Sequence, residues 1–517
     1  MKTLGLSFLL GLLSATGFQP LGLWPSTILA FTGLILLIER APRMRSALAL
    51  GWWFGMGQFV LGLNWIATAF TYQAAMPVWL GWVAVVVLSF YLAVYPAAAV
   101  GLAWRWGRTR PYPYEGERNQ DGKLENFPAP PVPLILTLAA AWIVTEYLRG
   151  SMFTGFAWNP VGVSLIDTWL KWPARLIGTY GLSGLVVLLA GVVYWSFRIR
   201  NSLAYGLLSA ALVGVLAMDL RLTGPLPANE EEARPLIRVV QPNIPQEEHQ
   251  DATQEEGNFR KLLRLSGRPD GMPRLILWPE SAIPYDLHHG AASGLIAQVI
   301  GPQDLLLAGG MEVAAPQPGT EAAAYNSLYV LGPGARILGR YDKAHLVPYG
   351  EYLPMRPFLT MLGLSRLVPG QGDILSGPGP QTLPLPGFGR MGGQICYEII
   401  FSGEVVERAN RPDFIFAPSN DAWFGLFGPP QHFAQARLRA IEEGLPVIRS
   451  TPTGITGVID AQGRVVERLP AHAEGVIDMR LPAAAAPTLF SRFGNLLPLA
   501  FALLLVAGAI AVRRKTR

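Results

Sequence analysis

The chain has 517 residues, of which 51% are hydrophobic and only 15% are charged. A soluble domain of this length carries more charge, so we expect part of the chain to lie in lipid. The formal net charge is +5, and most of the basic residues stand beside apolar runs, which is typical of membrane topology and argues against a nucleic-acid-binding protein.

Eight apolar runs predict membrane-spanning helices, since a helix needs about 20 apolar residues to cross a bilayer. Seven of them precede a long polar segment and one follows it. The first run follows Lys2 and also fits a signal peptide, but it lacks a clear small-residue cleavage site, so we expect it to be retained. The runs are residues 3–18, 21–38, 47–69, 77–104, 133–148, 172–197, 203–220 and 495–512.

Basic residues in the short loops predict the orientation, because Lys and Arg near span ends stay in the cytoplasm. With eight alternating spans, most of them fall on the side of the N-terminus, and Arg149, Lys171 and Arg221 are minor exceptions. We therefore expect a membrane domain over residues 1–222, an external domain over 223–490, and a last span with a basic cytoplasmic tail over 491–517. The cytoplasmic set is Lys2, Arg40, Arg43, Arg45, Arg105, Arg108, Arg110, Arg118, Lys123, Arg198, Arg200, Arg513, Arg514, Lys515 and Arg517.

The external segment has normal charge density and short apolar runs separated by Gly, Pro, Asn and Asp. This pattern predicts a soluble α/β domain, and roughly 250 residues are enough for one core. The turn at residues 332–334 predicts a hairpin between 327–331 and 335–338. Further strands are expected at 236–241, 274–278, 304–308, 392–395, 413–417 and 447–450, and helices at 256–266, 294–300 and 431–443.

Three chemically different residues follow three of these strands. Glu280 follows the strand at 274–278, Lys343 follows the hairpin, and Cys396 follows the strand at 392–395. Active-site residues of α/β domains commonly lie at strand ends. A thiol attacks a carbonyl as its thiolate, so it needs a base for its proton and a cation for the charge that develops. The three residues supply these functions, although Cys396, the sole cysteine, taken alone also fits an apolar core position.

The trio with its flanks resembles the Glu–Lys–Cys triad of the nitrilase (carbon–nitrogen hydrolase) superfamily. With the apolar runs, the whole chain resembles the apolipoprotein N-acyltransferase family. Residues 341–351, 419–425, 449–451, 146–150 and 63–66 are also similar to family signatures. The resemblance implies a polytopic α-helical membrane domain of about eight spans and an α/β nitrilase-like domain with an αββα sandwich, inserted between the seventh and eighth spans on the periplasmic side of the bacterial inner membrane.

The resemblance also implies the chemistry. Cys396 is then the nucleophile, Glu280 the general base and Lys343 the group that stabilises the oxyanion. A phospholipid, typically phosphatidylethanolamine, gives an acyl chain to the cysteine as a thioester. The α-amino group of the S-diacylglyceryl cysteine of a lipoprotein then takes it. Lys343 near the thiol should lower the pKa of Cys396.

Several other residues have candidate roles. Glu351, Tyr397 and Glu398 match positions that support the triad in the family, although the two glutamates also fit solvated surface positions. Asn420, Trp423 and Phe424 are candidates for contact with substrate, and the aromatic stretch at 423–428 fits either an acyl pocket or a core. Residues 357–368 fit either a core helix or a lid that dips into lipid.

Two features limit the assignment. The family usually carries a tryptophan shortly after the stretch at 243–246, but residues 247–251 here are Glu, Glu, His, Gln and Asp. His345 lies near Lys343, but without a Cys/His cluster we expect a structural role and predict neither a metal nor a cofactor.

Two functions of other classes stay open from the residues alone. A membrane-tethered amidase or nitrilase would use the same triad and hand the acyl group to water, so only the acceptor distinguishes it. A transporter or sensor with an external binding domain would make the triad a coincidence. Few ionisable residues lie in the middle of the predicted spans, which argues against transport.

Overall fold

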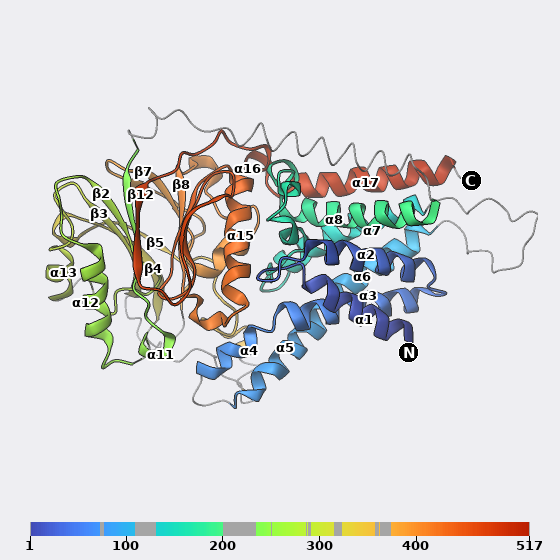
Figure 1. The fold of residues 1–517 in the computed structure, drawn as a ribbon, viewed down its shortest axis with the longest axis horizontal. Helices are drawn as coiled ribbons and strands as arrows, with labels where there is room; N and C mark the ends of the chain where they lie inside the picture. The colour runs from blue at the N-terminus through green and yellow to red at the C-terminus, as the bar shows by residue number, and fades with distance from the viewer. Residues whose placement is uncertain are drawn as a thin grey trace, which may run out of the picture. The chain divides into compact units, whose positions relative to one another are not determined.

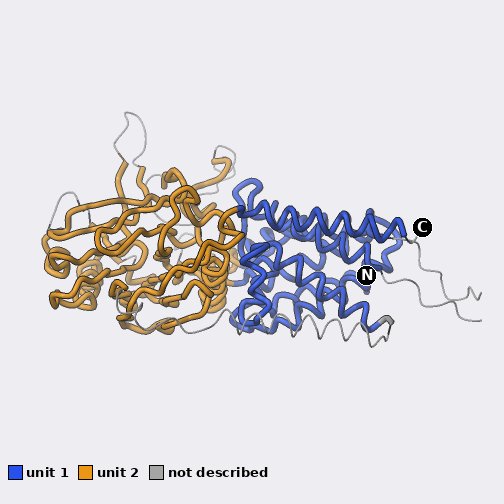
Figure 2. Tube along the Cα trace, turned by 90° about the horizontal axis from the view of Figure 1, so that it is seen from above, with its two compact units in different colours: residues 1–64, 82–223, 493–517 blue, residues 65–81, 224–492 orange. Residues whose placement is uncertain are grey.

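The structure is a computed structural model that describes residues 2–72, 77–108, 131–199, 234–249, 251–285, 287, 291–314, 323–356, 361 and 374–515. Its contacts divide the chain into two compact units (Figure 2). The first contains residues 1–64, 82–223 and 493–517, and the second contains residues 65–81 and 224–492.

The first unit is helical (Figure 1). Its apolar core includes fully buried side chains from several helices, among them Phe31, Phe54 and Trp142. The helices are α1 (Lys2–Ala15), α2 (Trp24–Glu39), α3 (Met44–Gly62), α5 (Trp79–Leu92), α6 (Val94–Gly107), α7 (Val132–Ser151), α8 (Ala174–Ile199) and α17 (Leu496–Lys515), with short turns η2 (Val161–Leu165) and η3 (Trp169–Lys171) between α7 and α8.

Small residues let two of these helices approach closely. A Cβ at Gly11 of α1 would collide with the carbonyl oxygen of Phe54 on α3, and one at Gly57 of α3 would collide with that of Phe8 on α1. Small residues serve this purpose in membrane helices, where van der Waals packing drives association. The hydroxyl of Ser7 adds a hydrogen bond of 2.7 Å to the carbonyl of Leu50 across the same interface.

The lengths of the helices test the number of spans. Four stretches are long and apolar enough to cross a membrane, namely residues 79–107, α7, residues 174–197 and α17, and a fifth is the bent pair of α3 with residues 66–72. Helices α1 and α2 contain 14 and 16 residues, fewer than the ~20 of a typical span. The described residues therefore do not confirm eight spans, and the predicted span at 203–220 lies outside them.

The second unit contains two six-stranded sheets. In the first sheet, in the order β12-β1-β2-β3-β4-β5, the neighbours β1, β2 and β3 run parallel and the other pairs are antiparallel. Its strands are β1 (Leu236–Gln241), β2 (Arg274–Leu277), β3 (Leu305–Val313), β4 (Ala324–Gly332), β5 (Arg336–Asp342) and β12 (Gly475–Arg480).

The second sheet repeats this plan in the order β11-β10-β9-β8-β7-β6, with β7, β8 and β9 parallel. Its strands are β6 (Thr382–Leu385), β7 (Gly389–Gly393), β8 (Phe414–Pro418), β9 (Val447–Ser450), β10 (Thr456–Ile459) and β11 (Val465–Leu469). Hydrogen bonds join the sheets, because Ser450 donates to the carbonyl of Val240 at 2.7 Å and the amide of Thr456 donates to the Gln241 side chain at 3.1 Å.

Helices cover the outer faces of both sheets (Figure 1). Helices α12 (Glu255–Ser266) and α13 (Ala291–Ile296) pack on the first sheet and α15 (Gly428–Glu443) on the second. The layers therefore form the αββα sandwich that the resemblance implied. The remaining short elements are α4 (Ile66–Ala69), η1 (Phe70–Tyr72), α11 (Gln246–His249), η4 (Pro333–Ala335), η5 (Cys396–Ile400), η6 (Arg408–Asn410), η7 (Asp421–Phe424) and α16 (Leu489–Phe493).

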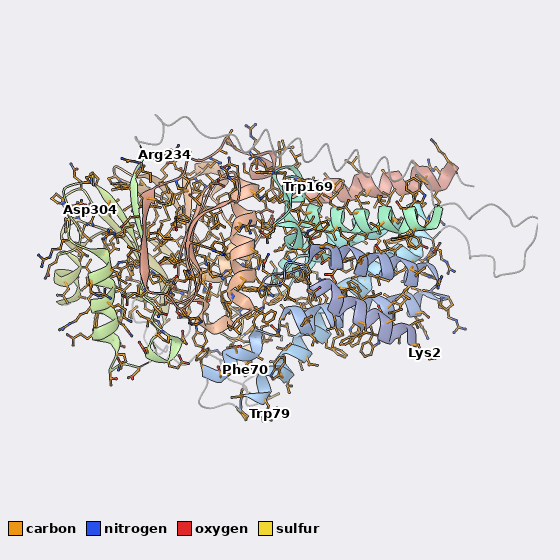
Figure 3. The ribbon with its side chains drawn as sticks, in the orientation of Figure 1. Lys2, Phe70, Trp79, Trp169, Arg234 and Asp304 are labelled. Carbon is orange, nitrogen blue, oxygen red and sulfur yellow. The ribbon has the colours of Figure 1, made fainter. Side chains whose placement is uncertain are left out.

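The strands and helices predicted for this unit are confirmed, with shifts of a few residues at their ends. The predicted hairpin is formed by β4 and β5. The sequence did not predict β6, β10, β11 and β12. One segment of the second unit also comes from elsewhere in the chain: residues 65–81, which include Phe70 on η1 and Trp79 at the start of α5 (Figure 3).

The last residue of α15 gives the first prediction. Glu443 is 1% exposed, and burial, followed by the neighbouring Glu442 carboxylate, raises its pKa to about 7. The folded state therefore binds a proton more tightly than the unfolded chain, so the free energy of unfolding falls as pH rises from about 4.5 to about 7. The full shift corresponds to roughly 3 kcal/mol. We expect Glu443→Gln to raise the melting temperature at pH 8 and to leave it nearly unchanged at pH 4.5.

The control is Glu256→Gln, which removes an exposed carboxylate paired with Arg260 on α12. Exposed pairs contribute little, so this variant should melt like the wild type at both values of pH. Equal melting of Glu443→Gln and wild type at pH 8 would contradict the cost assigned to the buried charge.

Candidate active site

Three strand ends bring the predicted catalytic residues to one place. Glu280 follows β2, Lys343 directly follows β5, and Cys396 begins η5 just after β7. The first two elements belong to one sheet and the third to the other. Because the sheets pack face to face, these ends meet although the residues lie far apart in sequence. All three side chains are buried.

Lys343 is held between two carboxylates. Its ammonium Nζ lies 2.8 Å from Oε1 of Glu351 and 3.7 Å from Oε1 of Glu280. Burial alone would lower the pKa of Lys343, but the charges of Glu351, Glu280 and Cys396 outweigh burial and raise it. The lysine therefore stays charged in a site where it is 1% exposed.

Asn326 on β4 fixes the two carboxylates relative to each other. Its side-chain amide nitrogen donates to Glu280 at 2.9 Å and to Glu351 at 3.3 Å, and its backbone carbonyl accepts from the backbone amide of Lys343 at 2.9 Å. The second oxygen of Glu351 accepts the amide of Val347 at 2.7 Å. The sequence did not identify Asn326, and its only signal was a polar residue in a largely buried strand.

Cys396 sits in a constrained backbone. Its φ of 54° lies in the left-handed region, which costs free energy for a residue with a Cβ and is found where the surroundings impose it. The thiol donates a hydrogen bond to the Glu280 carboxylate, and the backbone amide of Asn420 donates to the sulfur. The base and the nucleophile are therefore already in contact.

Electrostatics keep the thiol protonated at rest. Burial, and after it the charge of Glu280, raise the pKa of Cys396 well above its usual value, although Lys343 acts in the opposite direction. As expected, the charge of Lys343 lowers the pKa of the thiol, but burial and the charge of Glu280 act more strongly in the opposite direction. Burial, opposed by Lys343 and assisted by Glu351, also raises the pKa of Glu280. The thiol must therefore lose its proton during attack, with Glu280 as the acceptor in contact.

The Glu398 carboxylate accepts hydrogen bonds from residues next to Lys343 and from the residue before Cys396. Its Oε1 accepts the hydroxyl of Tyr341 at 2.7 Å and the amides of Ala344 and His345 at 2.8 and 3.0 Å. Its Oε2 accepts the amide of Ile395 at 2.7 Å. One buried carboxylate thus connects the residues around Lys343 with the residue before Cys396.

A second buried cluster holds the carbonyl of Cys396. His432 on α15 donates from Nε2 to this carbonyl at 3.0 Å, and its Nδ1 lies 3.0 Å from Arg449. Burial and the charge of Arg449 lower the pKa of His432, and the same Nδ1 lies 3.1 Å from Oδ1 of the Asp421 carboxylate. Arg449 also donates to the Asp421 carboxylate. Residues 419–425 and 449–451 were noted as signatures, but these roles and that of His432 were not predicted.

The other predicted residues lie around this centre. The Tyr397 ring packs edge-on against Phe401 and His345, and His345 stacks on Phe401 with centroids 3.6 Å apart, a structural role as expected. The side chain of Asn420 donates to Gln246 at 2.8 Å. Trp423 and Phe424 follow it on η7. Contact of these three with substrate stays a prediction, and the predicted lid at 357–368 lies outside the described residues except for Met361.

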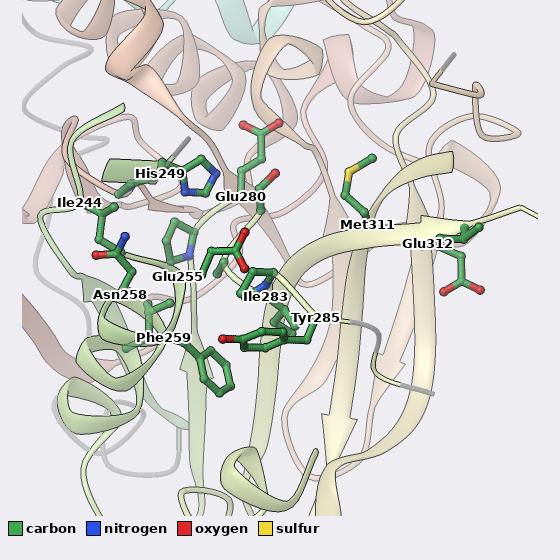
Figure 4. Close-up of a pocket in the computed structure, with 17 residues that line it drawn as sticks. Ile244, His249, Glu255, Asn258, Phe259, Glu280, Ile283, Tyr285, Met311 and Glu312 are labelled. Atoms are coloured by element: carbon green, nitrogen blue, oxygen red, sulfur yellow. The ribbon is translucent and has the colours of Figure 1, made fainter. Parts of the chain in front are cut away.

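A cavity of about 600 Å³ adjoins Glu280. Its lining is mostly apolar and includes Phe259, Ile283 and Tyr285. His249, within the stretch where the family tryptophan was expected, also lines it. In Figure 4 the Glu280 carboxylate points away from Phe259 and Tyr285. Within the described ranges, no cluster of His, Cys, Asp and Glu is arranged to hold a metal ion.

Comparisons with known proteins identify the family of this chain. A family model described as "Apolipoprotein N-acyltransferase N-terminal domain" matches residues 10–192, and one described as "Carbon-nitrogen hydrolase" matches residues 236–487. An apolipoprotein N-acyltransferase of Rhodopseudomonas palustris is 34% identical, with 99% of this chain and 95% of the relative covered. The chain belongs to the apolipoprotein N-acyltransferase family. It is therefore an acyltransferase of the carbon–nitrogen hydrolase superfamily, as the motifs predicted.

Further relatives extend the comparison. An apolipoprotein N-acyltransferase of Bradyrhizobium diazoefficiens is 36% identical, with 98% of this chain and 94% of the relative covered. Among solved structures, Saccharomyces cerevisiae Nit3 aligns with a TM-score of 0.34 and 17% identity over 52% of this chain and 95% of its own. An amidase variant from Nesterenkonia sp. AN1 aligns with a TM-score of 0.32 and 14% identity, covering 54% and 96%.

The Glu398 network gives the second prediction. In Glu398→Gln the amide oxygen can replace only one of the two carboxylate oxygens. The amide NH₂ group then faces another donor, either the N–H of Ile395 or the donors near Lys343, and no hydrogen bond forms there. We expect a loss of roughly 3 kcal/mol in the free energy of unfolding, together with loss of acyl transfer.

Thermal unfolding of the purified protein measures the loss. Tyr341→Phe is the matched comparison, since it removes only one of the four donors to Glu398, and it should cost roughly 1 kcal/mol. A Glu398→Gln variant as stable as Tyr341→Phe would show that the carboxylate does not join the two segments.

Proposed function

We propose that this chain transfers an acyl chain from a phospholipid to the α-amino group of the N-terminal S-diacylglyceryl cysteine of lipoproteins, through a thioester on Cys396. The observation that carries the proposal is the hydrogen bond between the Cys396 thiol and the Glu280 carboxylate beside the buried Lys343 ammonium. The names of the relatives supply the acceptor class.

The first half-reaction follows from the proton states. The Cys396 sulfur attacks the ester carbonyl carbon as its proton moves to Glu280. The negative charge that develops on the carbonyl oxygen is stabilised by Lys343, which is charged and excluded from water. The carbon–oxygen bond of the ester then breaks, and the lysophospholipid oxygen takes the proton from Glu280. The products are a lysophospholipid and an acyl thioester.

The second half-reaction uses the same groups in a ping-pong sequence. The acceptor amine attacks the thioester carbonyl and passes one proton to Glu280, while Lys343 again stabilises the oxyanion. The carbon–sulfur bond breaks, the amide leaves, and Glu280 returns the proton to the Cys396 sulfur. One carboxylate thus serves as base and acid in turn, which suits a group whose pKa burial raises.

We further propose the surroundings in which this occurs. The chain has eight spans in the bacterial inner membrane, with a membrane domain at 1–222, a periplasmic catalytic domain at 223–490, and a last span with a cytoplasmic tail at 491–517. The long apolar helices and the basic residues beside the apolar runs support this arrangement. No cofactor takes part in the proposed reaction.

We assign substrate contacts to Asn420, Trp423 and Phe424 on the loop beside Cys396, and Glu351, Tyr397 and Glu398 act as supports. The backbone of Asn420 already donates to the sulfur, which supports its closeness to the reacting atoms. The cavity beside Glu280 has a mostly apolar lining, but Cys396 and Lys343 are not among its lining residues, so we do not assign it to the acyl chain.

The third prediction concerns the acceptor. Purified protein is mixed with phosphatidylethanolamine in detergent and with a short peptide that begins with S-diacylglyceryl cysteine. Mass spectrometry should show the peptide gaining one acyl chain, with free fatty acid as a minor product. Cys396→Ala should abolish the product, and Glu280→Gln should slow its formation by roughly 10²- to 10⁴-fold.

Glu467→Gln serves as the control, because this carboxylate is exposed on β11, away from the three strand ends, and its rate should equal that of the wild type. Free fatty acid as the main product in the presence of the peptide would indicate a hydrolase. An acylated peptide formed equally by Cys396→Ala would rule out the thioester route.

A further inference from the structure

Trp65, α4 and η1 form a short segment, here named the 65–72 segment. It packs on the loop after β8 that contains η7. The Trp65 ring meets the Phe424 ring edge-on, with centroids 4.8 Å apart and an angle of 73°. Tyr72 meets Trp423 in the same way at 5.5 Å and 82°. Both contacts lie within the second unit.

The fit between this segment and the loop is close at the backbone. Gly425 has a φ of 55°, and a Cβ there would stand 2.6 Å from the Thr68 hydroxyl oxygen. A Cβ at Gly428 would stand 3.4 Å from the Trp65 ring. Glycine at these positions permits the approach. The 65–72 segment therefore limits where the loop can lie.

The contacts continue from this loop to the nucleophile. Phe424 meets the His432 ring edge-on at 5.7 Å and 80°. His432 is fully buried and donates to the carbonyl of Cys396 at 3.0 Å. The path from Trp65 to Cys396 thus consists of two aromatic contacts and one hydrogen bond. The same loop carries Asn420, whose backbone amide donates to the sulfur.

We propose that Trp65 is a positioning residue for the nucleophile. It holds Phe424 against His432, and His432 holds the Cys396 carbonyl so that the cysteine keeps its left-handed backbone conformation. This inference rests on the proposed role of Cys396 as nucleophile. It gives a function to Trp65, one residue of the motif at residues 63–66.

Close packing around Cys396 accounts for this role. Cys396 adopts a φ of 54°, and such a conformation persists only when surrounding groups over-determine it. Protein interiors are close-packed, so the loss of a large ring leaves a void into which neighbours shift. Removing the Trp65 ring takes away one of the two rings that contact Phe424 edge-on and leaves it free to shift against His432. The shift then reaches the Cys396 carbonyl and changes the geometry at the sulfur.

The experiment uses the full chain with Trp65→Ala and, because edge-to-face packing needs only a ring, Trp65→Phe. Two rates are measured: single-turnover acylation of Cys396 by phosphatidylethanolamine, and alkylation of Cys396 by iodoacetamide as a function of pH. Since Cys396 is the sole cysteine, alkylation reports on this thiol without requiring the proposed reaction. Size-exclusion chromatography and circular dichroism verify that each variant is folded.

We expect Trp65→Ala to slow acylation on the order of tenfold to a hundredfold, as small misplacements of reacting groups do, with the KM for phospholipid unchanged. The midpoint of the alkylation profile should shift, because the thiol leaves its fixed position relative to Glu280, Lys343 and Asp421, the charged groups that act on it. Trp65→Phe should restore most of both properties. If Trp65→Ala does not fold, the milder Trp65→Leu takes its place with the same expected shift.

A double-mutant cycle tests the path itself. Phe424→Leu should slow acylation as Trp65→Ala does, and the double variant should be no slower than Phe424→Leu alone, because both changes act through one contact. The matched control is Trp142→Ala, another buried tryptophan in edge-to-face contact, 4.7 Å from Phe31 in the helical unit. It should lower stability but leave the alkylation profile of the folded protein unchanged.

The outcomes separate the two proposals. An alkylation midpoint that Trp65→Ala or Trp65→Leu leaves at the wild-type value, or effects of Trp65→Ala and Phe424→Leu that multiply, would overturn the positioning role. If Trp65→Ala shifts the alkylation midpoint while the wild-type protein forms no acyl-enzyme, the positioning role stands and the proposed function is overturned.

Discussion

The second unit depends on one constraint: the Lys343 ammonium must remain charged while almost entirely removed from water. An unpaired buried ammonium is very costly, and Glu351 and Glu280 meet the cost at 2.8 and 3.7 Å. Each carboxylate then needs donors of its own, which Asn326 provides for both. The end of β5, the end of β2 and the start of β4 are thereby fixed relative to each other by charge and hydrogen bonds.

The same constraint determines the chemistry at Cys396. A cation between two carboxylates leaves a net negative surrounding, and with burial this keeps the thiol protonated. The thiol therefore stays protonated at rest and transfers its proton to Glu280, to which it is already hydrogen-bonded, during attack. The charge of Lys343 instead stabilises the oxyanion that forms during the reaction, where a buried charge has its greatest effect. Glu398 and the cluster of His432, Asp421 and Arg449 complete the site by holding the backbone on both sides of the sulfur.

Much of this arrangement can be predicted from sequence, and what cannot has physical reasons. The run before Glu280 is continuously apolar, so β2 and its end are visible, and the flanks of all three catalytic residues carry family signatures. Strand β11 contains exposed charged residues such as Glu467 and Arg468, and so lacks a strand pattern. His432 looks like any residue of a helix, because its role depends on a carbonyl 36 positions away. The net shift of the thiol pKa could not be predicted from sequence, because burial, which outweighs the effect of Lys343, exists only in the folded chain.

The central claim is that Cys396 carries the acyl chain. Intact-protein mass spectrometry after incubation with phosphatidylethanolamine tests it most directly, with Cys396→Ala treated alongside. The account predicts a mass gain of one acyl chain on the wild type, removed by hydroxylamine as a thioester would be, and no gain on the variant. A folded wild-type protein that transfers acyl chains to the acceptor peptide while never showing this adduct, or a variant that shows it equally, would contradict the account.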